Sequence, residues 1–145
     1  MPWYRNLIYK GINLEGAWYL HTESQKILLE IKQNSESITG KATAHAITPK
    51  KDHFDSLKTF DVKGSIHERF LLLTFLHTDT KRIGIVTQLV QIEGDGTVMK
   101  GTGSWYAPRK SKIISGDIEY YRDELSAKNA CERQKQEKLT KQSSQ

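Results

Sequence analysis

The residues best suited to binding chemistry form a short aromatic and cationic run. Trp105 and Tyr106 are followed closely by Arg109 and Lys110. An aromatic plane stacks on a heterocyclic base with roughly 1–3 kcal/mol, and neighbouring cations hold phosphates. The run therefore predicts a site for a ligand that carries both a ring and negative charge. The plainer alternative is that Trp105 belongs to the core and the cations are solvated surface.

Side chains for catalysis or metal binding show no such grouping. The five histidines lack zinc-ligand spacing, and the single cysteine, Cys131, lies in a polar tail. The segment Gly101–Gly103 precedes no helix signal, which excludes a dinucleotide-binding fingerprint. Asp117 and Glu119 share the polar face of a strand pattern, where carboxylates favour solubility. We expect no enzyme activity, no metal and no cofactor.

Composition limits the class of protein. The chain has 145 residues, enough for one domain, with 37% hydrophobic and 27% charged residues. No apolar run reaches the roughly 18 residues of a transmembrane helix, and no signal peptide is recognised. A single cysteine fits a reducing compartment, so we expect a cytoplasmic protein. The net charge of +5 permits an anionic partner, but we expect no DNA or RNA polymer.

Period-2 alternation predicts eight strands that position these residues. The strands are Glu15–His21, Lys26–Gln33, Glu36–Ile47, Lys58–His67, Phe70–His77, Arg82–Ile92, Thr97–Trp105 and Lys112–Arg122. Short turns favour an up-and-down order, and internal glycines permit strong coiling. We predict an all-β fold, a closed eight-stranded antiparallel barrel over residues 14–122. An open two-sheet sandwich is the alternative. Residues 1–13 form a lead or plug, and residues 123–145 a helical or disordered tail.

An up-and-down barrel gathers alternate loops at one end, and that end is basic. From it we select Lys81, Arg82, Arg109 and Lys110 as the cations that meet a ligand beside Trp105 and Tyr106. The longest loop, residues 48–57, joins this mouth. Small residues share the inner faces of two strands, which favours a cavity over a filled interior. They are Gly40, Ala42, Ala44, Ala46, Gly101 and Gly103.

The first strand carries a short motif, Gly16-Ala17-Trp18, and Arg122 follows the last strand. This arrangement resembles lipocalin-like (calycin) barrels. The resemblance implies that Trp18 packs at the closed end and that Arg122 lies across it. A cation–π contact between the two would help to close the barrel.

A narrower resemblance covers most of residues 3–122. Trp3-Tyr4-Arg5, Leu14 to Trp18, Leu29 to Gln33, Gly101 to Gly103 and Ser115 to Glu119 are similar to the β-barrel domain of the two-transmembrane β-barrel effectors of bacterial anti-phage CBASS systems. It implies a receptor for a cyclic dinucleotide. The family's membrane helices are absent from this sequence. If they precede it in a longer protein, the barrel lies at the cytosolic face of the inner membrane.

Two other hypotheses about the function remain open. The barrel could carry or sense a small apolar molecule, with the basic rim incidental. It could also be a scaffold or a self-associating subunit, because Phe70–His77 and Arg82–Ile92 are apolar on both faces. Its interface would then use Leu72, Leu76, Val86 or Val90.

Overall fold

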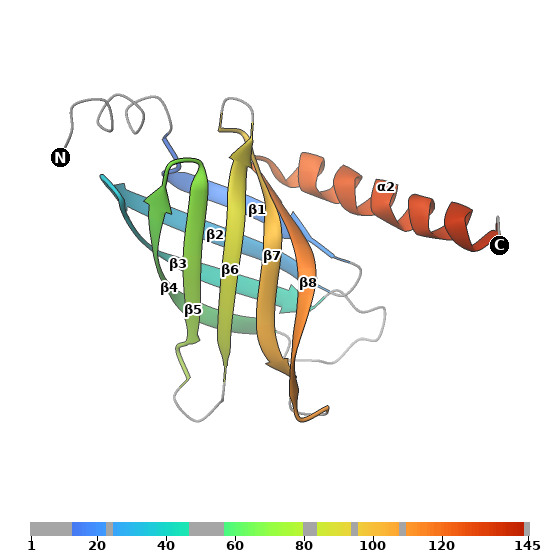
Figure 1. Ribbon diagram of the computed structural model, residues 1–145, viewed down its shortest axis with the longest axis horizontal. Coiled ribbons are helices and arrows are strands. Elements are labelled where there is room, and N and C mark those ends of the chain that lie inside the picture. Colours follow the sequence, from blue (N-terminus) through green and yellow to red (C-terminus); the bar gives the residue numbers. More distant parts are fainter. Residues whose placement is uncertain are drawn as a thin grey trace.

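A computed structural model of the chain describes residues 13–22, 25–46, 57–79, 84–93, 96–107 and 110–143. The elements are β1 (Gly16–His21), β2 (Gln25–Asn34), β3 (Ser37–Ala46), β4 (Leu57–His67), β5 (Phe70–His77), β6 (Ile85–Glu93), β7 (Val98–Ala107), β8 (Lys112–Tyr121) and α2 (Glu124–Ser143). Each strand pairs antiparallel with the next, and β8 closes on β1. The closed barrel is confirmed, and the open sandwich is wrong. In Figure 1, β5–β8 cross in front of β1–β4.

The alternating inner residues form one core at the closed end of the barrel. Its fully buried members come from every strand, and they include Trp18, Leu29, Ile38, Val62, Ile66, Leu71, Leu73, Val90, Ile92, Met99 and Tyr120. The structure also settles the two strands that are apolar on both faces. Leu72 and Leu76 point outward as expected, whereas Val86 and Val90 face the core, so their assignment to an interface was wrong.

Tight turns and close backbone approaches at strand glycines explain the strong coiling. Ser35 and Glu68 begin the β2–β3 and β4–β5 turns with φ of 57° and 59°, as two-residue hairpins require. At Gly101, a Cβ atom would lie 1.9 Å from the carbonyl oxygen of Leu89 on the paired strand. Any side chain there would push β6 and β7 apart, so glycine at this position lets the sheet curl into a barrel.

The seam between β1 and β8 is the shortest pairing in the barrel, with one registered pair, Tyr19 and Tyr121. Helix α2 packs beside it through Ala127 and Ala130, which are 2% and 3% exposed. The Asp123 carboxylate accepts hydrogen bonds from the backbone and the hydroxyl of Ser126, which caps the helix. The tail is therefore helical over this range. Among the residues described, no helix is long and apolar enough to cross a membrane.

Candidate functional site

Among the described residues, more of the inner face is exposed toward one end of the barrel. The inner side chains in the closed half are almost fully buried, whereas several in the opposite half, the mouth half, are half-buried. The mouth-half residues are Ile27, Phe60, His77, Val86, Trp105 and Ile114. The mouth half is therefore the more exposed part of the described interior, and a ligand that approaches the interior from this end would meet it first.

Aromatic rings line the mouth half. Phe60 packs edge-on against His77 and Phe75, with centroids 5.1 Å and 6.3 Å apart. Trp105 faces inward from β7, and its ring passes over Gly116, where an added Cβ would lie 3.1 Å from the indole. Gly103 likewise lies under the side chain of Gln88. These two glycines thus make room for neighbouring side chains and not for free space.

A buried polar pair lies deeper in the same interior. The Tyr120 hydroxyl donates to Gln88 Oε1 at 2.7 Å, and Gln88 is only 6% exposed. Because Oε1 accepts this bond, the Gln88 amino group is left to donate elsewhere. Burial raises the pKa of Tyr120 well above its usual value of 10, so the phenol stays neutral and remains a donor.

A second donor lies near the rim. His77 Nδ1 accepts the backbone N–H of Asp79 at 3.0 Å, so the neutral imidazole carries its hydrogen on Nε2. That Nε2 is buried and has no hydrogen-bond partner among the residues described. The interior therefore offers N–H donors to a ligand with acceptor atoms.

The Tyr120–Gln88 bond yields a stability prediction. Tyr120→Phe removes the donor and leaves a buried carbonyl oxygen unpaired, which we expect to cost about 1–3 kcal/mol. Adding Gln88→Met removes the orphan acceptor, so the double variant should lose less than the sum of the single variants. Urea unfolding of all four proteins measures this. Strictly additive losses would contradict the coupling.

The cations at the mouth divide into three groups. Alternation puts Lys58 and Lys112 on the inward side of β4 and β8, paired with Ala44 and Ala107. Lys110 is exposed in the β7–β8 turn. Lys81, Arg82 and Arg109 lie outside the described residues, as does most of the loop over 48–57. Lys58 and Lys112 are not among the cations selected from the sequence, although each lies two residues before an inward side chain, Phe60 and Ile114, and so shares its face.

Tyr106 does not join Trp105. The two residues are neighbours on β7, so their side chains point to opposite faces, and Tyr106 is 37% exposed on the outside. Tyr106 therefore does not line the barrel interior with Trp105, and its role as a ligand contact stays a prediction.

At the closed end, Gly16, Trp18 and Arg122 come together. The Arg122 guanidinium lies 4.0 Å from the centre of the Trp18 ring, and Trp18 is fully buried. Arg122 also donates to the carbonyl oxygens of Asn13 and Glu15, and Trp18 Nε1 donates to that of Leu14. Gly16 has φ of 112°, a conformation that side chains disfavour. These contacts tie the start of β1 to the end of β8.

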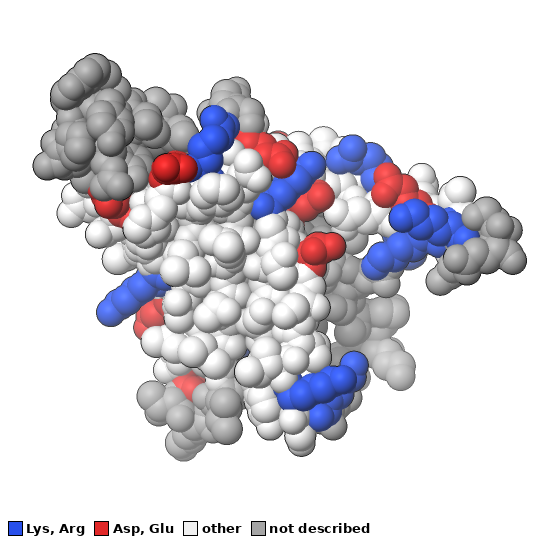
Figure 2. Space-filling view, viewed as in Figure 1, with Lys and Arg blue, Asp and Glu red and all other residues white. Residues whose placement is uncertain are grey.

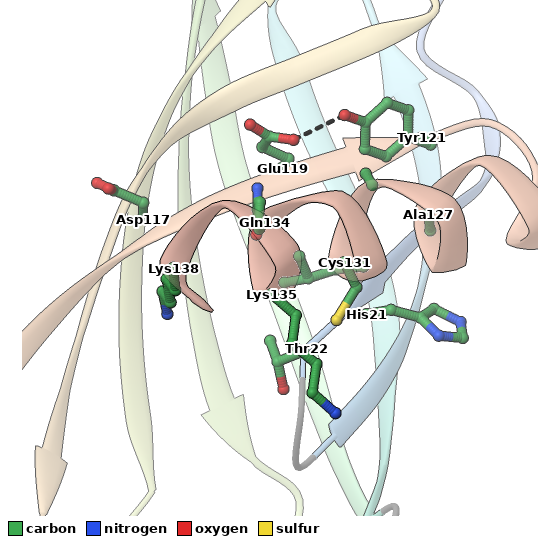
Figure 3. A pocket seen from close by; sticks show the side chains of 12 residues that line it. His21, Thr22, Asp117, Glu119, Tyr121, Ala127, Cys131, Gln134, Lys135 and Lys138 are labelled. Carbon is green, nitrogen blue, oxygen red and sulfur yellow. Dashed lines mark hydrogen bonds between the residues drawn. The ribbon is translucent and has the colours of Figure 1, made fainter. Parts of the chain in front are cut away.

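A hollow of about 150 Å³ lies between β1, β8 and α2. Figure 3 shows its polar lining, in which the Tyr121 hydroxyl donates to Glu119. Asp117 and Glu119 oppose Lys135 and Lys138 of the helix across this hollow. Both signs of charge line it, and three or more metal-binding side chains do not gather anywhere in the described ranges. The aromatic mouth half is the stronger candidate site.

His21, at the end of β1, lies beside the first turn of α2. Its side chain is 8% exposed, Nε2 has no hydrogen-bond partner in the described structure, and Glu124 is 3.7 Å away. Glu124 binds Lys26 at 2.8 Å instead. Burial lowers the pKa of His21; Glu124 opposes this shift, and Lys26 and Lys128 add to it.

This environment predicts a pH dependence of stability. As pH falls below about 6.5, the unfolded chain takes up the His21 proton before the folded chain does, so stability falls. Asp123 and Glu124, whose pKa values are lowered, lose their contributions only at more acidic pH. We expect His21→Phe to flatten the stability profile between pH 7 and pH 5, measured by urea unfolding. An unchanged slope would contradict the assignment.

No protein-family model matches the chain, and no curated protein matches it. Among solved structures, the bradavidin2–biotin complex is similar in fold. The TM-score is 0.56 at 17% identity, over 77% of this chain and 99% of that chain. At this identity the similarity concerns the fold alone. The chain is thus a closed eight-stranded antiparallel barrel of the kind seen in bradavidin2.

Proposed function

We propose that the protein is a receptor that binds a small molecule in the mouth half of the barrel, with a ring of the ligand inserted between the inner side chains. The observation that carries this proposal is an inner aromatic layer that solvent can reach, formed by Phe60, His77 and Trp105. A ring entering there meets aromatic faces and the N–H donor of His77. The bradavidin2 complex, whose ligand is biotin, supports the idea that a barrel of this fold can hold a small ring compound.

The ligand class we favour is a cyclic dinucleotide, sensed in bacterial anti-phage defence. One base would stack beside Trp105, and its acceptor atoms would meet the donors of His77 and Gln88. The phosphates would remain at the rim, near Lys58, Lys110 and Lys112, with Lys81, Arg82 and Arg109 as further cations from the sequence. The resemblance to CBASS effector barrels supports this class.

The alternative is a carrier of a small apolar molecule. The aliphatic side chains of the mouth half favour this alternative, because Ile27, Val86 and Ile114 line the interior together with the aromatic rings. In this case the rim lysines would be ordinary surface charges, because exposed charges are common at loop ends.

Calorimetric titration of the full chain separates the two. The panel is cyclic di-GMP, cyclic di-AMP, cyclic GMP–AMP, biotin and a medium-chain fatty acid. We expect one cyclic dinucleotide to saturate the protein. Trp105→Ala should then weaken binding about 5- to 100-fold, as loss of one stacked base does.

The matched control is Tyr106→Ala, because Tyr106 is the next residue and faces outward. Its affinity should equal that of the wild type. Binding of the fatty acid alone would establish the apolar carrier. Equal losses in the two variants would contradict a site on the inner face.

A further inference from the structure

The outer face of β5–β8 carries an unusually large apolar surface. Its large exposed side chains are Phe70, Leu72, Leu76, Ile85, Leu89, Tyr106 and Ile113, each between 37% and 73% exposed. They form a continuous sheet surface, since Leu72 pairs directly with Leu89, Leu76 with Ile85, and Tyr106 with Ile113. We call these seven residues the β5–β8 face.

No charge interrupts this face. Between its apolar members, the outward positions hold Thr74, Thr87, Thr102, Ser104 and Ser115. Figure 2 shows the same region as a broad uncharged area over the middle of β5–β8. Helix α2 packs beside β1 and β8 and leaves the face open. Uncovered apolar surfaces of this size mark interaction sites.

We propose that the β5–β8 face is an interface between two copies of this chain, related by a two-fold axis. The exposed fractions correspond to roughly 600 Å² of side-chain surface per copy, and the intervening hydroxyls bring this close to the roughly 800 Å² that each partner contributes to a stable interface. A two-fold contact uses the same surface on both copies, so one patch is sufficient.

Charge around the face favours a second copy. At the mouth end lies Lys110, which is exposed in the β7–β8 turn. Toward the closed end lie Glu93, Asp117 and Glu119, with Lys100 among them. A two-fold axis that lies in the interface, perpendicular to the strands, turns one copy end for end, so Lys110 of each copy approaches the end of the other copy that carries the carboxylates. The closed end carries three carboxylates against one lysine, so its charge is opposite in sign to that of Lys110, although each molecule has a net charge of +5.

The same border argues against a membrane. An anionic lipid surface binds apolar faces that are ringed by cations. Here the border is mixed: Asp117 and Glu119 lie beside Lys100 on one side, and Asp61 lies beside Lys63 of β4 on the other. The carboxylates would be repelled by anionic headgroups, whereas they complement Lys110 of a second copy.

Sedimentation velocity of the full chain without ligand tests the proposal, at protein concentrations from about 1 to about 100 μM, where interfaces of moderate affinity dissociate. We expect the wild type to shift from monomer to dimer as concentration rises. Leu89→Glu, at the middle of the face, should weaken the dimer at least about tenfold, because it places a charge in the interface.

The matched control is Thr39→Glu, which adds the same charge on the exposed outer side of β3. It should dimerise as the wild type does. Should Leu89→Glu fail to fold by circular dichroism, Leu72→Gln is the uncharged substitute and should also weaken the dimer.

Three results would overturn the proposal. One is a wild type that remains monomeric at every concentration. Another is a dimer that Leu89→Glu and Leu72→Gln leave intact. The third is a monomeric protein that binds anionic phosphatidylglycerol vesicles in a flotation assay and loses this binding in Leu89→Glu. That result would assign the face to lipid. Because no ligand is present, failure here leaves the calorimetric test of the receptor unaffected.

Discussion

Replacing Trp18 with alanine is expected to lower the free energy of unfolding by about 3–5 kcal/mol, the usual range for a buried tryptophan. Trp18 is 0% exposed and packs under Arg122, so its removal leaves a cavity at the point where the barrel closes. Urea unfolding followed by far-ultraviolet circular dichroism measures the loss. Tyr106→Ala, an exposed aromatic, is the control and should cost less than about 1 kcal/mol.

Arg122 extends this prediction. Arg122→Ala removes two hydrogen bonds to the backbone of Asn13 and Glu15 together with the cation–π contact. We expect a loss of about 1–3 kcal/mol. The double variant Trp18→Ala/Arg122→Ala should lose less than the sum, because each partner's contribution depends on the other. Additive losses would mean that the two side chains stabilise the barrel separately.

The fold was largely predictable because period-2 alternation fixes which side of a strand is buried. Their spacing alone puts Ile27, Leu29 and Ile31 on one face of β2, and all three face the interior. The two strands that are apolar on both faces, β5 and β6, were the exception. In β5 and β6 apolar residues occupy both faces, so alternation gave no register, and only pairing with β4 and β7 determines that Val90 points inward.

The sequence does not decide whether residues 123–145 are helical or disordered, and the reason is different. Its buried positions, Ala127 and Ala130, are small, so α2 shows no apolar stripe that spacing would reveal. Packing at the β1–β8 seam decides its position, and that seam is a tertiary feature. The capping pair Asp123 and Ser126 was the signal in the sequence that marked the start of the helix.

The candidate site was predicted in part. Trp105 was expected inside near the mouth, and strand alternation is enough to put it there. The choice of Tyr106 came from proximity in sequence, which ignores that neighbours on a strand face opposite ways. The Gln88–Tyr120 pair was missed because its partners are 32 residues apart and meet only across the closed interior.

The rim lysines give the second large prediction. If the ligand is a cyclic dinucleotide, Lys58→Glu/Lys112→Glu should weaken its binding at least about tenfold at low salt, because two attractive charges become repulsive. The wild-type affinity should also fall as salt is raised from about 50 to about 500 mM, and the variant should lose most of that dependence. Titration calorimetry at both salt concentrations measures these changes.

The matched control is Lys32→Glu/Lys63→Glu, which changes the net charge by the same amount on exposed outward positions of β2 and β4. A uniform field effect would weaken both double variants equally, whereas contact at the rim weakens only the first. Equal losses would therefore remove Lys58 and Lys112 from the site. Unchanged binding in both would mean that the ligand meets the barrel through its ring alone, as a small apolar molecule would.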